Sequence, residues 1–427
     1  MQIYVTKPGD TLTSIARKFN VDLDELIEIN DIKNVNSLVV GQALIIETDF
    51  NSVYIVKPGD TLSKIARENN MPLLEILDLN PTLQPPYRLY VGQRINVEPN
   101  EEARKHITLN GFAYYTSSSE EVANALTDLT YLSIFAYRYD ENGRLIDLDD
   151  KRLVELSKYY ETMPLLTITN QNEKGSFSSD YADKLFKDED MQKNLIEDLT
   201  IKVRDTRYSG VIVDFEYIYP RNMAEFIDFI SKLRESIKQA GDFSLLVALA
   251  PKYSSNQKGI LYEAHDYERI GKLADYVILM AYEWGYTYGP PMAVAPLPEV
   301  KKVVEYATRV IDKSKILLGY PNYGYDFTLP YEQGKSKAKS VDNRSIPELA
   351  KKYHAIIQYD EYQQSPYFTY TSDGVKHIVY FTDARSIQAE AKLVEQYDLG
   401  GISVWSLNKY YAPIFEIITN LYIVKKK

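Results

Sequence analysis

The sequence has 427 residues, too many for one average domain, and its net charge of −11 makes it a poor candidate for binding phosphate backbones. It has no cysteine and only four histidines, which excludes disulfides and a cysteine nucleophile and disfavours a histidine-rich metal centre. We therefore expect no metal ion and no cofactor. No apolar stretch reaches 18 residues, so no transmembrane helix is expected. Residues 1–5 lack the basic start and apolar core of a signal peptide.

The first 99 residues contain an internal repeat with a period of 50. The segment 4–17 includes Lys-Pro-Gly-Asp-Thr-Leu and returns with few changes at 54–67. Each copy continues with an apolar helical pattern that ends at Asn30 or Asn80, and closes with Val-Gly-Gln before a short strand. The pattern predicts strand, Pro-Gly turn, two helices and return strand, with the Asp-Thr pair of each copy placed to cap its first helix.

This repeat resembles the LysM module, which has the same Gly-Asp-Thr-Leu, central Asn and closing Gly-Gln. The resemblance implies two βααβ modules, residues 1–49 and 50–99, that bind N-acetylglucosamine-containing glycans such as peptidoglycan or chitin. Their grooves would lie beside residues 30–33 and 80–83, and two weak modules would gain avidity on a polymer. The alternative is that Gly-Asp-Thr-Leu is only a turn and cap. The residues that the resemblance assigns to glycan binding are Gly9, Asp10, Thr11, Leu12, Gly59, Asp60, Thr61 and Leu62.

After a polar linker at 98–106, buried strand patterns alternate with amphipathic helices. The strands are expected at 107–114, 131–135, 165–169, 210–214, 244–249, 276–280, 316–319 and 401–405. Helical patterns between them include 190–204, 223–239 and 299–312. Eight strand–helix units predict an α/β fold, a (β/α)8 TIM barrel over residues 100–427. Further strand patterns and a Ser-Asp-Gly turn at 372–374 predict a small α+β insertion after strand seven, about 325–381, forming a cleft wall or only a decorative loop.

Two acids follow the buried strand at 210–214. Asp214 ends the β-branched run and Glu216 comes two residues later, so in an extended chain they face one way, roughly 7 Å apart. Repulsion should raise at least one carboxyl pKa, which suits a general acid near neutral pH. The alternative is a pair of solvated loop residues. Barrel enzymes place their chemistry at the carboxyl ends of strands, which favours the catalytic interpretation.

Three motifs at strand ends resemble glycoside hydrolase family 18, the chitinase-like barrels. They are Asp214-Phe-Glu216-Tyr217, Met280-Ala-Tyr282-Glu283 and Gly400-Gly401-Ile-Ser-Val-Trp405. The chain departs from the family pattern where Ser209 and Ile212 replace the two outer aspartates of the first motif, and where Glu283 replaces an aspartate. Loss of the middle aspartate removes a proton partner of Asp214 and could shift the pH optimum.

The family resemblance implies retaining hydrolysis assisted by the substrate's own 2-acetamido group. Glu216 would protonate the glycosidic oxygen, Asp214 would hold the acetamido N–H, and Tyr282 would hydrogen-bond the acetamido oxygen. Trp405 would form the floor of the reacting subsite. The other substrate-binding candidates are Glu283, Met280, Tyr323 and Trp284.

The combination of two LysM modules, this barrel and the segment at 380–386 resembles the spore cortex-lytic enzymes of spore-forming Firmicutes. The resemblance implies an N-acetylglucosaminidase that acts on peptidoglycan containing muramic δ-lactam during germination, at the spore coat and cortex boundary, made without a signal peptide. Two alternatives stay open: a chitinase or chitin-oligosaccharide hydrolase, and a non-catalytic glycan-binding protein of the cell wall or spore coat. Family members that have become lectins lose the glutamate, which this chain keeps as Glu216.

Overall fold

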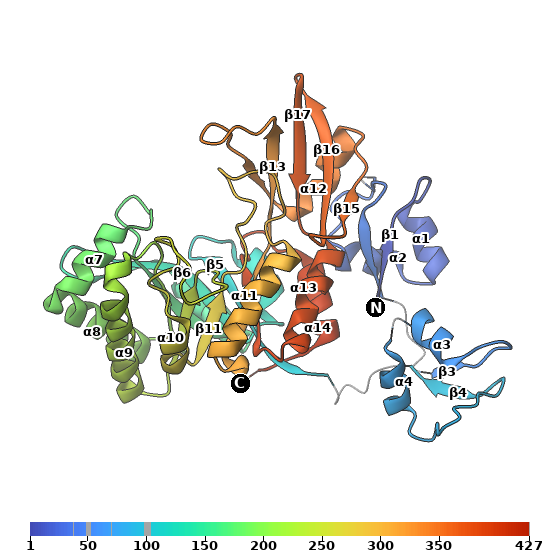
Figure 1. Ribbon diagram of the computed structural model, residues 1–427, viewed down its shortest axis with the longest axis horizontal. Helices are drawn as coiled ribbons and strands as arrows, with labels where there is room; N and C mark the ends of the chain where they lie inside the picture. The colour runs from blue at the N-terminus through green and yellow to red at the C-terminus, as the bar shows by residue number, and fades with distance from the viewer. Residues whose placement is uncertain (37, 48–52, 70, 98–103, 427) are drawn as a thin grey trace.

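The computed structural model describes residues 1–36, 38–47, 53–69, 71–97 and 104–426. Figure 1 shows a barrel, a sheet-containing insertion standing over one end of it, and two small N-terminal modules beside them. None of the helices in the described ranges is both long enough and apolar enough to cross a membrane.

Each N-terminal module has the predicted βααβ fold, with its two strands paired antiparallel. Module 1, the first copy of the repeat, contains β1 (Gln2–Val5), α1 (Leu12–Phe19), α2 (Leu23–Ile29) and β2 (Ala43–Ile46). Module 2, the second copy, contains β3 (Val53–Ile55), α3 (Leu62–Glu68), α4 (Leu73–Leu79) and β4 (Arg94–Asn96). Asn30 fixes the return strand of module 1, since its side-chain amide bonds the Ile45 N–H and C=O. Asn80 does the same at Asn96 in module 2.

The prediction of two capping residues per copy is half right. Thr11 caps α1 by accepting a hydrogen bond from Ser14 N at 3.0 Å, as expected of an N-cap threonine. Asp10 does not cap the helix. Its carboxylate accepts hydrogen bonds from the Tyr4 hydroxyl at 2.8 Å and from Lys7 N at 2.7 Å, so it closes the Pro-Gly turn against the first strand. Module 2 repeats this division between Thr61 and Asp60.

The (β/α)8 barrel is confirmed: in the described chain, eight parallel strands close a sheet in the order β5-β18-β12-β11-β10-β9-β8-β6, with β6 returning to β5. Their bounds are β5 (His106–Tyr114), β6 (Tyr131–Tyr139), β8 (Met163–Thr169), β9 (Gly210–Asp214), β10 (Ser244–Leu249), β11 (Tyr276–Leu279), β12 (Ile316–Pro321) and β18 (Gly401–Trp405). Two short strands pair with the ends of barrel strands: β7 (Leu145–Ile146) with the end of β6, and β19 (Ile423–Val424) with the start of β5.

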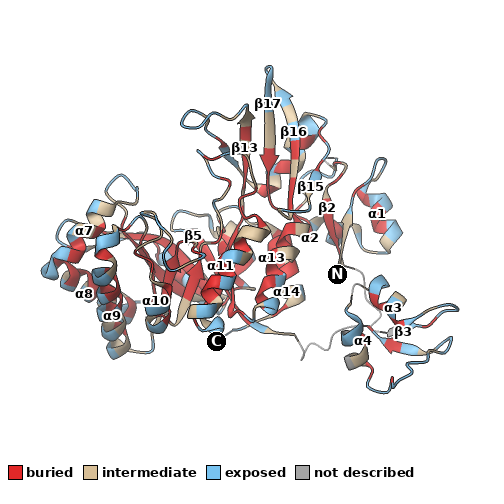
Figure 2. Ribbon diagram, in the orientation of Figure 1, coloured by how far each residue is buried: buried red, intermediate tan, exposed pale blue. Residues whose placement is uncertain are grey.

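Helices surround the barrel and cover the outer faces of its strands (Figure 1). They are α5 (Ser119–Leu126), α6 (Lys151–Tyr159), α7 (Ser179–Lys187), α8 (Glu189–Asp205), α9 (Met223–Ala240), α10 (Tyr267–Leu273), α11 (Leu297–Val310), α13 (Ala384–Gln396) and α14 (Ala412–Leu421). Burial is concentrated in the strands and in the inward faces of these helices (Figure 2). Inside the barrel a second cluster, which includes Leu165, Ile212 and Leu317, fills the interior, so the barrel is a packed core.

The insertion after β12 is an antiparallel sheet in the order β14-β13-β17-β16-β15 with one α-helix against it. Its elements are β13 (Gly324–Leu329), β14 (Lys339–Val341), α12 (Ile346–Lys352), β15 (Gln358–Asp360), β16 (Ser365–Ser372) and β17 (Val375–Tyr380). The predicted hairpin turn is present, with Asp373 and Gly374 at φ of 50° and 77° between β16 and β17. The sequence interpretation missed β13, which only two residues, 322 and 323, separate from the end of β12.

Candidate active site

Asp214 lies in the mouth of the barrel at the end of β9. The strand alternates, so Asp214 points to the same side as Ile212, whose side chain belongs to the inner cluster. Only 4% of Asp214 is exposed, and its Oδ1 has no hydrogen-bond partner within the described residues. This burial raises the pKa of Asp214 to about 7. Ile212 therefore gives Asp214 an apolar floor where the family pattern has a carboxylate.

Glu216 follows the strand and is half-buried beside Asp214. Burial raises the pKa of Glu216 well above its usual value, and the charges of Asp214 and Glu283 raise it further. The direction of the Glu216 shift agrees with the expectation from the sequence, but burial is its largest cause and repulsion between the acids is the smaller one. A carboxyl group that stays protonated near neutral pH can act as a general acid.

Two buried side chains hold the backbone that carries Glu216. Asn170, just after β8, accepts the Glu216 N–H at 2.9 Å and donates to the Glu216 carbonyl at 2.8 Å. His265 accepts the Ala250 N–H through Nδ1 at 2.9 Å, so its Nε2–H donates to the Phe215 carbonyl at 3.1 Å. Burial lowers the pKa of His265 to about 4, which keeps the ring neutral in this role. The acid pair is thus fixed from both sides.

We predict that Asn170→Ala lowers kcat about 10- to 100-fold, with a smaller effect on KM, because Glu216 loses the two bonds that position it. The unpaired backbone groups should also lower the free energy of unfolding by about 1–3 kcal/mol. Steady-state kinetics and thermal unfolding measure the two effects. The matched control is Asn172→Ala, which removes an asparagine of the same loop that bonds Lys174 N and Ser176 N instead. Equal losses of kcat in both variants would contradict the positioning role.

Glu283 is hydrogen-bonded to two tyrosines, one from the link between β12 and β13 and one from β13 of the insertion. Its carboxylate accepts hydrogen bonds from the Tyr323 hydroxyl and, at 3.2 Å, from the Tyr325 hydroxyl on β13. Glu283 has a φ of 68°, and Tyr217, next to Glu216, has a φ of 53°. Bulky residues seldom adopt this left-handed conformation, and such strain is typical of functional sites. The insertion thus reaches the candidate active site through Tyr325.

Tyr282 sits between the acids and the β12 strand. Burial raises the pKa of Tyr282 well above its usual value, and the charges of Asp214, Glu216 and Glu283 raise it further, so the phenol keeps its proton. A Cβ at Gly319 would lie 2.3 Å from the Leu279 carbonyl oxygen and 2.9 Å from Cε1 of Tyr282, so the glycine lets β12 lie against β11 and also leaves room for the ring.

Trp405 lies at the end of β18 in an aromatic cluster over the inner core. Its ring meets Phe135 edge-on at 4.8 Å and Phe112 at 5.3 Å between centroids, with Tyr114 at 6.0 Å. The other predicted binding residues lie on the loop after β11. Met280 directly follows β11 and is partly exposed, and Trp284 packs against the outer cluster, with its backbone N–H bonded to the Val294 carbonyl.

The eight LysM residues predicted to bind glycan divide by burial. Gly9 and Thr11 are exposed, as are Gly59 and Thr61 of module 2. The side chains of Leu12 and Leu62 are 4% and 8% exposed and belong to the cores of their modules. A ligand could therefore meet only the backbone of these leucines, and glycan binding by the loop stays a prediction.

Sequence reasoning missed Asn170, His265 and Tyr325. Asn170 follows a barrel strand directly, so the rule that strand ends carry function could have found it. Tyr325 lies on the overlooked strand β13. His265 has no comparable signal, because its loop is far from Phe215 in the sequence and only the fold brings the two together.

Comparisons with known proteins agree with this geometry. The description "Glycosyl hydrolases family 18" matches residues 110–409, and "LysM domain" matches residues 4–47 and 54–98. The "Cortical fragment-lytic enzyme" of Bacillus subtilis (strain 168) is 38% identical over 430 residues, covering 100% of this chain and 99% of that protein. The crystal structure of the Bacillus cereus spore cortex-lytic enzyme SleL superimposes with a TM-score of 0.86 at 32% identity, covering 100% of this chain and 98% of that one.

A chitinase from Chromobacterium violaceum ATCC 12472 shares the fold at a TM-score of 0.67 and 22% identity, over 74% of this chain and 98% of its own. At that identity the likeness concerns the fold alone. The family match covers most of the chain, the modules match twice, and the acid pair occupies the mouth of the barrel. The chain belongs to glycosyl hydrolase family 18 and is a glycosidase with two N-terminal LysM domains.

Proposed function

We propose that the chain is a retaining β-N-acetylglucosaminidase that hydrolyses spore cortex peptidoglycan containing muramic δ-lactam during germination. The observation that carries the proposal is similarity over the full length, modules included, to proteins named cortical fragment-lytic enzymes, together with the retained acid pair. Glycan binding by the LysM domains would hold the enzyme on the same polymer that it cleaves.

The proposed reaction begins with proton transfer from Glu216 to the glycosidic oxygen, which its raised pKa permits. As that bond breaks, the 2-acetamido oxygen of the substrate attacks C1 and forms an oxazolinium ion. Asp214 accepts the acetamido N–H and offsets the positive charge, and the Tyr282 hydroxyl donates to the acetamido oxygen. The ionised Glu216 then takes a proton from water, which attacks C1 and gives a product with retained configuration.

The remaining candidates would shape the substrate cleft. Trp405 offers a flat apolar ring to a sugar face at the floor of the reacting subsite. Glu283, held by Tyr323 and Tyr325, adds a carboxylate within the same group. Met280 and Trp284 would contribute apolar contacts from the loop after β11. Action at the spore coat and cortex boundary is part of the proposal and rests on the names of the relatives.

Substrate choice tests the proposal directly. The purified chain is incubated with cortex fragments containing muramic δ-lactam and, separately, with chitin oligomers, and products are identified by mass spectrometry. We expect faster turnover of the cortex fragments, with new reducing ends at N-acetylglucosamine. Faster cleavage of chitin would favour a chitin-oligosaccharide hydrolase, for which the shared chitinase fold is the supporting observation.

Chemical removal of the acetyl groups tests the assistance of the substrate. De-N-acetylated cortex glycan lacks the acetamido oxygen that replaces an enzyme nucleophile, so we predict a loss of at least about 100-fold in kcat/KM. Re-acetylation of the same material should restore hydrolysis. An unchanged rate on the deacetylated glycan would show that another group attacks C1.

A further inference from the structure

The two LysM modules differ in how they relate to the barrel. Module 1 packs β2 on α13 and α2 on α14, and Ile29, Ala43 and Ile45 belong to the outer hydrophobic cluster of the barrel. All four residues of β2 are buried, although an isolated two-stranded module needs to bury only one face. Figure 2 shows this continuous burial from β2 to the neighbouring helices.

Module 2 has polar residues at the matching positions. Arg94 and Asn96 stand where module 1 has Ala43 and Ile45, and both are exposed, so β4 buries only Ile95. The buried apolar residues of module 2 form a core of their own. For its described residues, the hydrogen bonds and ion pairs stay within the module. The repeat has therefore been adapted in one copy to dock and in the other to face water.

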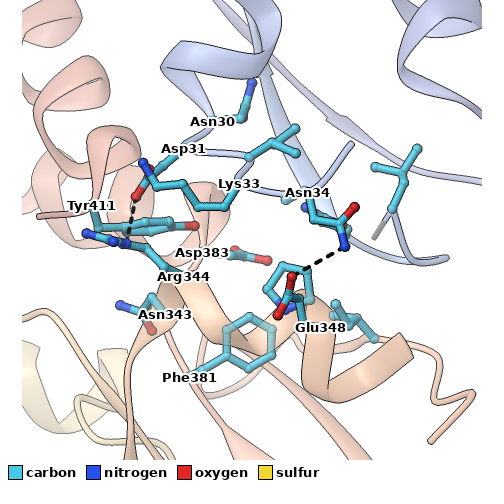
Figure 3. Close-up of a pocket in the computed structure, with 16 residues that line it drawn as sticks. Asn30, Asp31, Lys33, Asn34, Asn343, Arg344, Glu348, Phe381, Asp383 and Tyr411 are labelled. Carbon is cyan, nitrogen blue, oxygen red and sulfur yellow. Dashed lines mark hydrogen bonds and ion pairs between the residues drawn. The ribbon is translucent and has the colours of Figure 1, made fainter. Parts of the chain in front are cut away.

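Polar contacts fix module 1 against the insertion and the barrel. Arg344 of the insertion forms an ion pair with Asp31 of module 1 at 3.4 Å (Figure 3). The same guanidinium pairs with Glu121 of α5 at 2.9 Å, which ties it to the barrel. The backbone of module 1 is also bonded, since Ile357 N donates to the Val40 carbonyl at 3.0 Å. The side chain of Asp31 is only 4% exposed, so this pair is shielded from solvent.

The expected glycan-binding residues of module 1 border this junction, where Asn30 and Asp31 are buried. The second wall of the expected groove, residues 30–33, lines a cavity of about 40 Å³ together with Arg344 and Glu348 of the insertion (Figure 3). Lys33, like Gly9 and Thr11 on the first wall, is exposed. The junction thus covers one end of the expected second wall and leaves Lys33 and the first wall to solvent.

The insertion connects the two glycan sites. Near module 1 it contributes Glu348 of α12, which accepts from the Asn34 side chain at 3.4 Å, and Ile357. At the barrel mouth it contributes Tyr325 of β13, which bonds Glu283. In Figure 1 the insertion stands above the barrel, with module 1 beside its lower part.

We infer that module 1 is a remote subsite of the catalytic cleft, which holds an N-acetylglucosamine-containing strand at a fixed distance from Glu216, while module 2 acts as a separate tether. This inference rests on the proposed function. A fixed subsite makes binding of the distant end of a strand intramolecular, with an effective concentration that is high only for strands long enough to span both sites. Hydrolysis should then show a step in kcat/KM at one strand length.

Gly41→Ala and Gly92→Ala form a matched pair for the test. The two glycines have φ of 86° and 85°, so alanine strains both backbones alike. A Cβ at Gly41 would lie 1.9 Å from the Ile357 carbonyl oxygen, whereas one at Gly92 meets no atom within 4 Å. Gly41→Ala should therefore open the junction, and hydrogen exchange at Ile357 N–H should accelerate in that variant alone.

The functional readout is kcat/KM on cortex strands fractionated by length. We expect Gly41→Ala to lose the step, falling about tenfold on long strands, with unchanged turnover of an aryl β-N-acetylglucosaminide. Gly92→Ala should keep the step. If exchange shows an open junction but the step survives, or if the wild type shows no step, the inference is overturned. If the wild type cleaves neither substrate, the proposed function fails instead.

A second variant covers the case in which Gly41→Ala leaves the junction closed. Ala43→Arg combined with Ile45→Asn gives module 1 the residues that module 2 has at the matching positions. Module 2 has the same fold with Arg94 and Asn96 there, so the substitutions should not unfold module 1. Circular dichroism confirms that the variant is folded. If exchange at Ile357 N–H stays slow in both variants, the docking itself is wrong.

Discussion

Glu216→Gln is expected to lower kcat on cortex fragments by about 10³-fold or more with little change in KM. Glutamine keeps the shape and hydrogen bonds of the side chain but cannot give a proton to the leaving oxygen, and general acid catalysis contributes about 10²–10⁴-fold. The second step suffers too, because the same carboxylate must activate water. Release of reducing ends measures the effect.

Two comparisons separate this effect from a general loss of a buried acid. Glu390→Gln is the matched control, because Glu390 is a buried carboxyl on α13 whose pKa burial also raises well above its usual value. We expect near-normal activity from it. An aryl glycoside with a good leaving group needs less protonation, so Glu216→Gln should lose less on that substrate. Undiminished release of reducing ends from cortex would mean that Glu216 is not the acid and would favour a different site or a purely glycan-binding role.

The barrel could be predicted because its strands are buried on both faces and read as apolar runs. The predicted bounds of β9, β10 and β18 agree with the structure residue for residue. The end of β6 was placed four residues early, although Tyr137 and Tyr139 are strand-forming residues and are buried in the fold. β13 was missed although Tyr325 and Phe327 alternate as a strand requires, since its two-residue separation from β12 hid its start.

Features that depend on contacts between distant segments could not be predicted. Predicting the docking of module 1 requires knowing that α13 packs on β2 and α14 on α2, whereas the repeat alone makes the two modules look equivalent. The substitution of Ala43 and Ile45 by Arg94 and Asn96 was visible in the sequence, but its meaning required the interface. His265 likewise gains its role only when the fold places it under Phe215.

The acid pair shows the same limit at the scale of two residues. The spacing of Asp214 and Glu216 indicated mutual repulsion, yet burial contributes most to both raised pKa values. Desolvation depends on what lies beneath the carboxylates, and Ile212 became informative only when the barrel interior was known to be apolar at that level. The departure from the family motif thus acts on Asp214 by removing polar surroundings.

Asp214→Asn is expected to lower kcat/KM by about 10²-fold or more, because asparagine cannot offset the positive charge of the oxazolinium ion. The variant should also change the pH profile. The Asp214 charge raises the pKa of Glu216, so its removal lets that pKa fall, although burial still holds it above the usual value. The basic limb of the profile, where Glu216 loses its proton, should therefore move to lower pH. An unmoved basic limb would show that the two acids are not coupled.

Stability should change in the opposite sense to activity. The pKa of an aspartate is about 3.9 in the unfolded chain, and burial raises the pKa of Asp214 to about 7, so the folded state binds the proton more tightly. The contribution of Asp214 to stability is present below the unfolded pKa and is lost as pH rises through the folded pKa. Asparagine carries no charge at any pH, so at pH 8 the free energy of unfolding of Asp214→Asn should exceed that of the wild type by about 2–4 kcal/mol. The variant should therefore also unfold at a higher temperature. Near pH 4 the two proteins should match, and a gain at pH 8 with a loss of turnover would show that the site keeps Asp214 at the expense of stability.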